Sequence, residues 1–288
     1  MESISLREPK ANGSLAKKGE VIFMDYEMYI SVVTYVLVGL IGLCVGSFLN
    51  VVIYRLPLGM SLASPPSHCP KCDYKLKWYD NIPIISYLTL GGKCRSCHGP
   101  ISPRYTVVEI SCMLLWLTLP LSYGTDKILM IAYSAVATSA LIAIFFIDLE
   151  HMIIPDSLNA ILGIAGIVAI FADGYTEWYD HLIGALSALL LFLAVYYIAI
   201  LVLGREGIGF GDVKMAFALG LLLGWQKVIL ALVIGCTLAS AVLLIIRRVR
   251  GDEKTREYPL GPFLALGTLV SLIYGSHILE WYLSLFLI

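Results

Sequence analysis

Charged residues are scarce in this chain of 288 residues. Only 14% of the residues are Asp, Glu, Lys or Arg, and 59% are hydrophobic, whereas soluble domains carry about 25% charged residues. This deficit excludes an ordinary soluble domain and indicates an integral membrane protein. The formal net charge of −1 also lacks the basic excess that drives nucleic-acid binding, so we expect no nucleic-acid partner.

The sequence also lacks the short alternating segments of a transmembrane β-barrel. Its apolar runs instead approach about 20 residues, the length that crosses a bilayer as an α-helix. We therefore predict an all-α, polytopic bundle of about eight transmembrane helices in contact with membrane lipid. The runs lie near residues 29–49, 105–123, 128–147, 157–172, 182–203, 213–224, 226–246 and 260–286, and the sixth is short.

These runs divide the chain into four segments. Residues 1–23 are polar and do not resemble a cleavable signal peptide. Residues 1–27 are expected to form a disordered tail. Residues 28–54 are expected to be the first transmembrane helix, and residues 55–104 a polar loop. Residues 105–288 carry the remaining apolar runs and are expected to form the main membrane domain.

Basic residues gather in two of the loops. The loop 55–104 contains seven Lys and Arg residues, and the loop 247–256 contains five. Because loops rich in Lys and Arg stay in the cytoplasm, we place both loops there and the N-terminus outside. With this topology, the turns at 148–156 and 204–213 also lie at the cytoplasmic face.

Each of those two turns carries an acid at the edge of an apolar run. Asp148 follows the seven apolar residues "LIAIFFI", and Asp212 lies in "GIGFGDVK" just before a long apolar stretch. Either acid alone is typical of a solvated helix end. If packing brings the two together, repulsion and partial desolvation leave one protonated and the other ionised, so that one acts as general acid and the other as general base, as in aspartic proteases.

Three glycines, Gly207, Gly209 and Gly211, precede Asp212. They leave no side chain between this acid and a bound peptide, and glycine permits backbone angles that are closed to other residues. The alternative is an ordinary flexible turn between helices. Spacing by itself does not separate these two interpretations.

Four cysteines of the first basic loop form two close pairs. "CPKC" and "CRSC" give the spacing C-x2-C-x21-C-x2-C, which is typical of a zinc site with four thiolate ligands. The loop has too little apolar content for a large core, and a metal ion would hold it together. Redox-active pairs and thiols without a ligand are the alternatives. The predicted ligands are Cys69, Cys72, Cys94 and Cys97.

Taken in order, the motifs resemble the bacterial type IV prepilin peptidases, a family of bifunctional leader peptidases and N-methyltransferases. The resemblance covers nearly the whole chain from about residue 28. It rests on the cysteine pairs and on "GSFLNVVIYRLP", "NIPIISYL", "GGKCRSCHGPISPRYTVVE", "IDLEHMIIPD" and "GIGFGDVKM".

The resemblance implies a membrane aspartyl protease of the G-x-G-D type with Asp148 and Asp212 as catalytic residues. Such an enzyme cleaves the basic leader of type IV prepilins and type II secretion pseudopilins after a glycine, at the cytoplasmic face of the bacterial inner membrane. It then methylates the new N-terminal residue with S-adenosylmethionine. The resemblance assigns the methyltransferase part to the loop 55–104 and the aspartyl peptidase to the membrane domain 105–288. No glycine-rich nucleotide-binding motif follows a strand, so Gly92 beside Cys94 is assigned to the methyl-donor site by resemblance only.

Two alternatives remain at this stage. The first is a peptidase without methyltransferase activity, which the intact cysteine pairs disfavour because family members that do not methylate tend to lack them. The second is a zinc-stapled membrane transporter or scaffold in which the acids relay ions. A peptide product that depends on Asp148 and Asp212 would separate the enzyme from the transporter.

Overall fold

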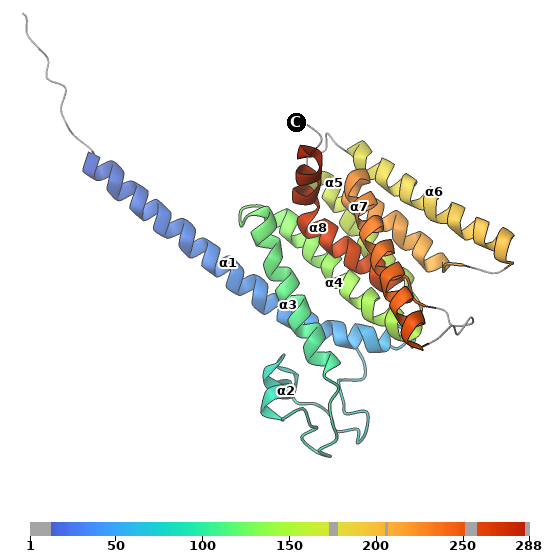
Figure 1. Ribbon diagram of the computed structural model, residues 1–288. Helices are drawn as coiled ribbons and strands as arrows, with labels where there is room; N and C mark the ends of the chain where they lie inside the picture. The colour runs from blue at the N-terminus through green and yellow to red at the C-terminus, as the bar shows by residue number, and fades with distance from the viewer. Residues whose placement is uncertain (1–12, 173–177, 205–206, 251–257, 286–288) are drawn as a thin grey trace, which may run out of the picture.

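The computed structural model of the protein describes residues 13–172, 178–204, 207–250 and 258–285. Within these ranges the chain is helical and has no strand, which confirms the all-α prediction (Figure 1). The helices are α1 Gly13–Arg55, α2 Ile85–Thr89, α3 Arg104–Tyr123, α4 Ile128–His151, α5 Asp156–Ala172, α6 Trp178–Leu203, α7 Phe210–Arg250 and α8 Gly261–Ser284.

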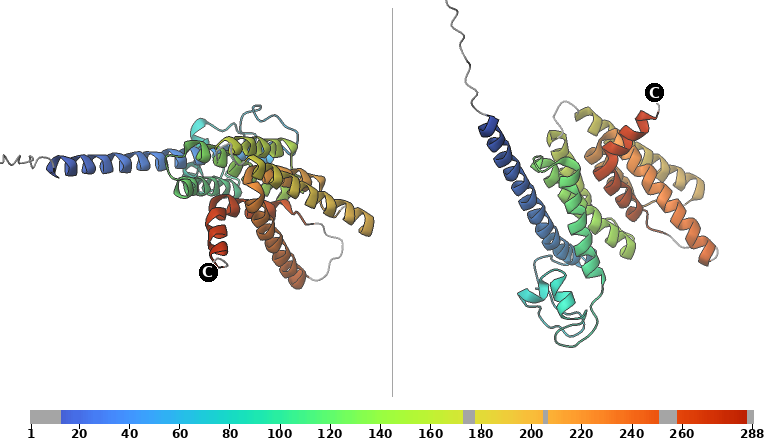
Figure 2. Two further views of the ribbon diagram at one scale, coloured as in Figure 1. Left: turned by 90° about the horizontal axis from the view of Figure 1, so that it is seen from above. Right: turned by 60° about the vertical axis from the view of Figure 1, so that its left-hand side comes forward.

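The N-terminal part of helix α1 extends away from the other helices, and its C-terminal part packs against α3 and α4 (Figures 1 and 2). Gly46 permits the close approach, because a Cβ atom added there would lie 2.8 Å from the Cα atom of Glu109. Residues 13–27 are helical, whereas the sequence predicted a disordered tail there. Helix formers such as Ala16, Lys17 and Glu20 favour this extension. Residues 1–12 of the predicted tail lie outside the described residues.

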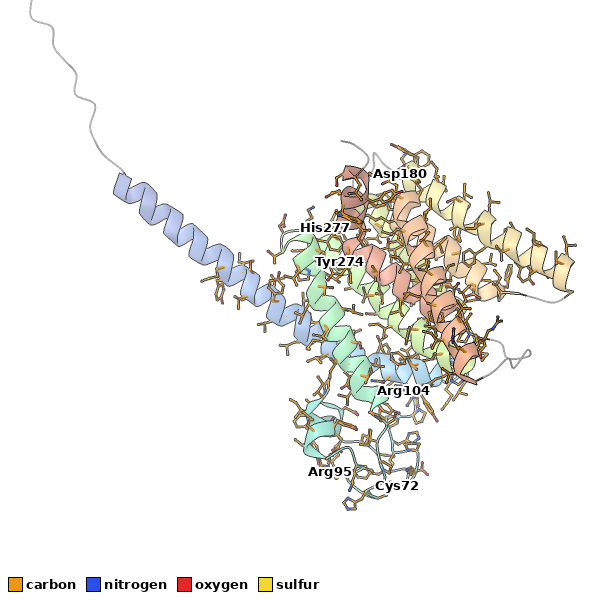
Figure 3. All side chains as sticks on the ribbon, in the orientation of Figure 1. Cys72, Arg95, Arg104, Asp180, Tyr274 and His277 are labelled. Atoms are coloured by element: carbon orange, nitrogen blue, oxygen red, sulfur yellow. The ribbon has the colours of Figure 1, made fainter. Side chains whose placement is uncertain are left out.

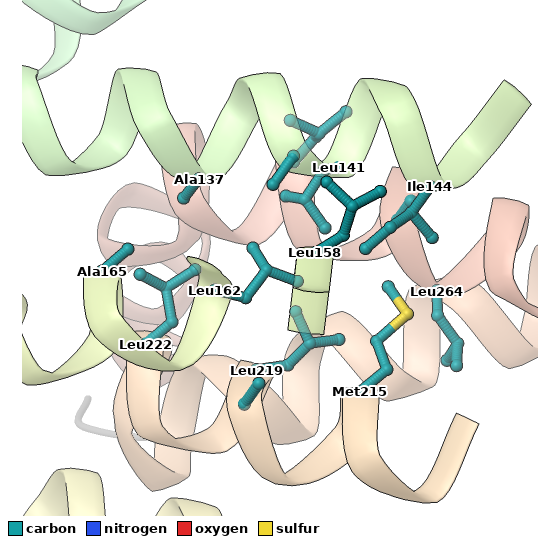
Figure 4. Packing of buried hydrophobic residues seen from close by; sticks show 14 of the residues in the cluster. Ala137, Leu141, Ile144, Leu158, Leu162, Ala165, Met215, Leu219, Leu222 and Leu264 are labelled. Carbon is teal, nitrogen blue, oxygen red and sulfur yellow. The ribbon is translucent and has the colours of Figure 1, made fainter. Parts of the chain in front are cut away.

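Helices α4, α5, α7 and α8 enclose the main hydrophobic core. Buried side chains from all four helices pack together (Figure 4), and among them are Ile144, Leu158, Leu162, Met215 and Leu264. Burial of each such side chain contributes about 1.5–3 kcal/mol where the alternative is water. The contacts fix the four helices relative to one another, and with them the helix ends that follow the core.

Helix α7 consists of two arms that meet at Gly224. This residue has φ 75° and ψ 173°, which no helix contains and which glycine adopts most readily. The first arm, residues 210–223, packs against α5 and α6, and the second, residues 225–250, packs against α8. The two arms correspond to the sixth and seventh predicted apolar runs.

The predicted number of spans agrees with the helices described. Six of them are long and apolar enough to cross a membrane, and α5, with 17 residues, is shorter. Counting α5 and the two arms of α7 separately gives the eight predicted segments. A multi-pass membrane protein is therefore confirmed. Most of the basic loop 247–256 lies outside the described residues.

The polar loop between α1 and α3 forms a separate small unit at one end of the bundle. It contains α2 and the 3-10 helix η1 Trp78–Asn81. Figure 3 shows Cys72 and Arg95 in this unit, beyond Arg104, whereas Asp180 and His277 lie at the opposite end of the molecule.

Candidate active site and cysteine centre

The core positions the two predicted acids at the same end of the bundle. Ile144, Met215 and Leu264 belong to one packed cluster. Asp148 follows Ile144 by one helical turn, and Asp212 precedes Met215 by slightly less than a turn. Gly261 precedes Leu264 by the same interval. The ends of α4, α7 and α8 therefore meet one turn beyond the core.

Asp148 is buried in the last turn of α4, with 5% of the residue exposed. Its Oδ2 accepts a hydrogen bond from the backbone N–H of Gly261 at 2.9 Å. Gly261 is the first residue of α8, so the carboxyl group faces the positive end of that helix dipole, which stabilises negative charge. Helix α4 ends at His151, three residues after Asp148, and the next residue, Met152, adopts a left-handed conformation with φ 55°.

Asp212 is buried in the first turn of α7, with 8% of the residue exposed. Its Oδ2 accepts a hydrogen bond from the backbone N–H of Gly209 at 3.1 Å. This is the acid half of a capping box, in which the third residue of a helix reaches back to the residue before the helix. The other oxygen, Oδ1, is buried without a hydrogen-bond partner among the residues described.

The two carboxyl groups lie near enough for the charge of Asp148 to act on Asp212. Ile154 stands beside both: added Cβ atoms on Gly211 and on Gly261 would each approach its side chain to 3.2 Å. The structure thus brings together the two acids that the sequence singled out, which lie 64 residues apart in the sequence, on α4 and α7. Their catalytic role stays a prediction.

The expected backbone freedom of the three glycines before Asp212 is wrong. Among the described residues, the glycines with positive φ are at other positions, such as Gly204 and Gly224. The three instead permit close packing: an added Cβ would meet the Ala199 side chain at 2.7 Å from Gly207, and Ile154 at 3.2 Å from Gly211. At Gly209 it would lie 3.3 Å from the Asp212 carboxyl oxygen.

Gly261 is a residue that the sequence interpretation missed. A Cβ atom at this position would lie 2.5 Å from Asp148 Oδ2, so only glycine allows the N–H group to reach the carboxyl oxygen. The sequence offers one indication, the Gly-Pro pair at 261–262, because Pro is favoured in the first turn of a helix and therefore marks an N-terminus.

The four cysteines also come together. Their Sγ atoms all lie within 4.8 Å of one another, with 3.9 Å between Cys69 and Cys97 and 4.0 Å between Cys72 and Cys94. Tetrahedral ligation at Zn–S distances of about 2.3 Å places the sulfurs about 3.8 Å apart. The cluster therefore fits a zinc ion.

The two cysteine pairs have the same backbone geometry. The Cys69 N–H donates to Tyr74 and the Cys94 N–H to Gly99, five residues ahead in each case. The residue after each pair, Asp73 or His98, has a positive φ of 55° or 54°. Hydrogen bonds from the backbone N–H groups of Cys97 and Ser96 lower the pKa of the Cys94 thiol to about 7, which favours the thiolate form that binds metal.

An ion pair between exposed Arg95 and buried Asp80 links this centre to η1. Asp80 has 1% of its side chain exposed and accepts a 2.8 Å hydrogen bond from Arg95 Nε. Burial by itself would raise the pKa of Asp80, but hydrogen bonds from Arg95 and from the Lys77 backbone outweigh it and hold the pKa below its usual range. Asp80 therefore remains ionised at neutral pH.

Glu109 anchors the loop to the membrane helices. This buried residue of α3 accepts a 2.8 Å hydrogen bond from the Ile84 N–H. Ile84 has φ 61°, which is uncommon for a β-branched residue. The hydrogen bond thus holds a strained residue of the loop against α3.

The backbone conformation and packing at position 92 explain why this residue is a glycine. Its φ is 68°, and an added Cβ would lie 3.0 Å from the Tyr87 hydroxyl oxygen. Packing against Tyr87 accounts for the glycine without a ligand. Its role in binding S-adenosylmethionine stays a prediction.

Known proteins with similar sequences cover most of the chain. A protein of Aeromonas hydrophila is 34% identical over 279 residues, which cover 87% of this chain and 94% of the relative. A Pseudomonas aeruginosa protein is 34% identical over 85% of this chain and 92% of its own length. Both are named prepilin leader peptidase/N-methyltransferase. The model of the type IV leader peptidase family matches residues 135–245. This chain belongs to the type IV leader peptidase family.

The N-terminal half of the chain also matches a family model. Residues 40–123 match the bacterial peptidase A24 N-terminal domain, which includes the cysteine loop. Membership in the leader peptidase family identifies the protein as an enzyme and leaves the transporter alternative without support. No solved structure shows a significant match.

Proposed function

We propose that this protein cleaves the basic leader of prepilins and type II secretion pseudopilins after a glycine, and then methylates the new N-terminal residue. The observation that carries the proposal is the meeting of two buried acids, Asp148 and Asp212, at one end of the bundle. The relatives also support the proposal, because they are named prepilin leader peptidase/N-methyltransferase.

The chemistry requires that the two carboxyl groups share one proton. The ionised group takes a proton from the water molecule that attacks the carbonyl carbon, and the protonated group donates its proton to the carbonyl oxygen. Collapse of the tetrahedral intermediate breaks the C–N bond, and a proton passes to the departing amine. Each Oδ2 is held by a backbone N–H, and Asp212 Oδ1 is buried without a hydrogen-bond partner among the described residues, so this oxygen can take part in proton transfer.

Helix lengths support a site recessed from the membrane surface. The first arm of α7, residues 210–223, is about 21 Å long and α5 is about 26 Å long, against a hydrocarbon thickness of about 30 Å. The apolar segment of a pilin can remain among the helices while its basic leader stays outside them. We place this face in the cytoplasm and the protein in the bacterial inner membrane, because the basic cysteine loop lies at the same end.

The loop is proposed to hold zinc through Cys69, Cys72, Cys94 and Cys97, which fit tetrahedral ligation. The ion would cross-link two segments that have no hydrophobic core of their own. S-adenosylmethionine would supply the methyl group for the new amino terminus. The intact cysteine cluster favours the bifunctional enzyme over a peptidase without methyltransferase activity.

A direct assay tests the proposal. Detergent-solubilised protein is incubated with a prepilin and labelled S-adenosylmethionine, and cleavage and label transfer are measured. Asp148→Asn and Asp212→Asn are each expected to lower cleavage roughly 10³-fold or more, because each removes a proton-transfer group. The fold should remain intact, since Asn still accepts the backbone hydrogen bond.

Asp180→Asn is the matched control, because Asp180 lies at the opposite end of the bundle (Figure 3). It should cleave like the wild type. Normal cleavage by either of the two site variants would refute the acidic pair, and no cleavage by the wild type would refute the proposed activity.

A further inference from the structure

The two halves of the chain meet in an ion pair at the end that carries the acids. Arg104 belongs to the half that matches the N-terminal domain, and Glu150 to the half that matches the peptidase family. Arg104 Nη1 donates hydrogen bonds to both carboxyl oxygens of Glu150. Among the described residues this is the ion pair that joins the two halves.

Both partners lie next to functional groups. Arg104 is the first residue of α3 and directly follows the cysteine loop, as Figure 3 shows. Glu150 comes two residues after Asp148, in the last turn of α4. Asn50 of α1 donates a 3.0 Å hydrogen bond to the carbonyl oxygen of Tyr105, so the start of α3 is also tied to α1.

Neither charge suits its own helix. A cation at a helix N-terminus, such as Arg104, and an anion at a C-terminus, such as Glu150, are both disfavoured by the helix dipole. The side chains are 20% and 37% exposed, and pairs with this exposure contribute little to stability. The pairing between the helices, rather than local helix preference or global stability, accounts for these two residue types.

We propose that Arg104 and Glu150 are positioning residues that hold the loop-bearing end of α3 beside Asp148. This inference rests on the proposed function. Two reactions occur in turn on one peptide end, so the amino terminus released at the acids has to reach the methyl-transfer site. The Arg104–Glu150 pair fixes the relative position of the two sites at the point where α3 and α4 meet.

The test compares the full-length wild type with Arg104→Gln, Glu150→Gln and the exchanged double variant Arg104→Glu/Glu150→Arg. The exchange restores the pair and also places each charge at the helix end that its dipole favours, so it should fold well. The assay measures kcat and KM for prepilin cleavage, and the ratio of methylated to cleaved product in a single turnover.

Each single variant is expected to lower the methylated-to-cleaved ratio several-fold, and the exchanged variant to restore it. Asp156→Asn is the matched control, because it breaks the Asp156–Lys214 pair within the peptidase half and should leave the ratio unchanged. An unchanged ratio in both single variants, or no recovery in the exchanged variant, overturns this inference. Absence of cleavage by the wild type would instead overturn the proposed function.

Discussion

Gly261 contributes no side chain, yet its N–H group holds the carboxyl group of Asp148. The donor comes from the start of α8, 113 residues further along the chain. A backbone donor at this position can approach the acid only because no Cβ atom intervenes. The geometry of Asp148 therefore depends on a residue that cannot itself react.

Gly261→Ala is expected to lower prepilin cleavage about 10²-fold, because displacement of a catalytic group by about 1 Å has an effect of that size. An added Cβ would lie 2.5 Å from Asp148 Oδ2 and push the carboxyl group away. The cleavage rate of purified protein measures the effect. Gly163→Ala is the control, because a Cβ there meets nothing within 4 Å; equal rates in the two variants would contradict the assigned role.

Asp80→Asn is expected to weaken the cysteine centre at neutral pH. The loss is about 1 kcal/mol, less than for a fully buried pair, because Arg95 is 45% exposed and solvent screens the interaction. Competition with a chelator should show zinc affinity reduced roughly five-fold, since ordering of the loop is linked to metal binding.

The pKa of Asp80 gives the pH at which to make this measurement. Because the folded-state pKa is lowered, the contribution of Asp80 is fully present above its unfolded value of about 3.9 and is lost as pH falls through the folded value. A measurement at neutral pH therefore includes the whole contribution of ionised Asp80. Asp73→Asn, in the same loop at φ 55°, is the control, since Asn tolerates that conformation; a similar loss there would contradict a specific role for Asp80.

For single residues, the sequence predicts the site residues that have reactive side chains and misses those that act through the backbone. Asp148 and Asp212 stand out because acids are rare beside apolar runs, and the cysteines because their spacing matches a ligand set. Gly261 carries no such mark. The glycines before Asp212 pack against side chains of the chain itself, so their predicted clearance for a bound peptide stays a prediction. Their φ angles depend on how α7 begins, which composition does not reveal.

Among the structural elements, the cysteine loop is the one that we propose is held in an ordered conformation by a metal ion. Its two turns share one hydrogen-bond pattern and converge on four sulfurs. Asp80 and Glu109 add polar anchors at its edges. These few contacts surround no sizeable hydrophobic core, so a cross-link at the centre would supply most of the constraint.

Removal of two ligands should release the metal. Purified wild type is expected to contain one zinc ion per chain, and Cys72→Ser combined with Cys97→Ser to contain none. Metal content by mass spectrometry measures this. The serine variant should also lose methylation, while the membrane helices keep their helical content by circular dichroism. A wild-type preparation that is native and free of metal would contradict the zinc assignment.

The helices also show which of their features the length of apolar runs predicts and which it does not. Apolar length predicted the spans because a bilayer imposes a length on any helix that crosses it. It could not fix where α1 begins, since residues 13–27 mix charged and apolar side chains without a long apolar run, and local helix preference extends the helix. The sequence predicted separate apolar runs at 213–224 and 226–246, and the break lies at Gly224, the last residue of the first of these runs. An isolated glycine does not specify its backbone angles, so the sequence did not identify this residue.

For the whole molecule, the positive-inside rule placed the acids and the basic loop on one side before any contact was known. The structure confirms that they share one end, through Arg104 and Glu150. Distances between helices, by contrast, arise from packing of many side chains, such as those in Figure 4. No local pattern contains that information, so the meeting of the acids required the fold.

The hydrogen bond from Gly261 to Asp148 also sets an order of assembly. The ribosome synthesises both acids before it reaches residue 261, so a chain that stops earlier contains both carboxyl groups and lacks the amide that fixes one of them. The acidic pair is complete only after α8 has entered the membrane and packed against α4. During synthesis, α8 therefore completes the acidic pair.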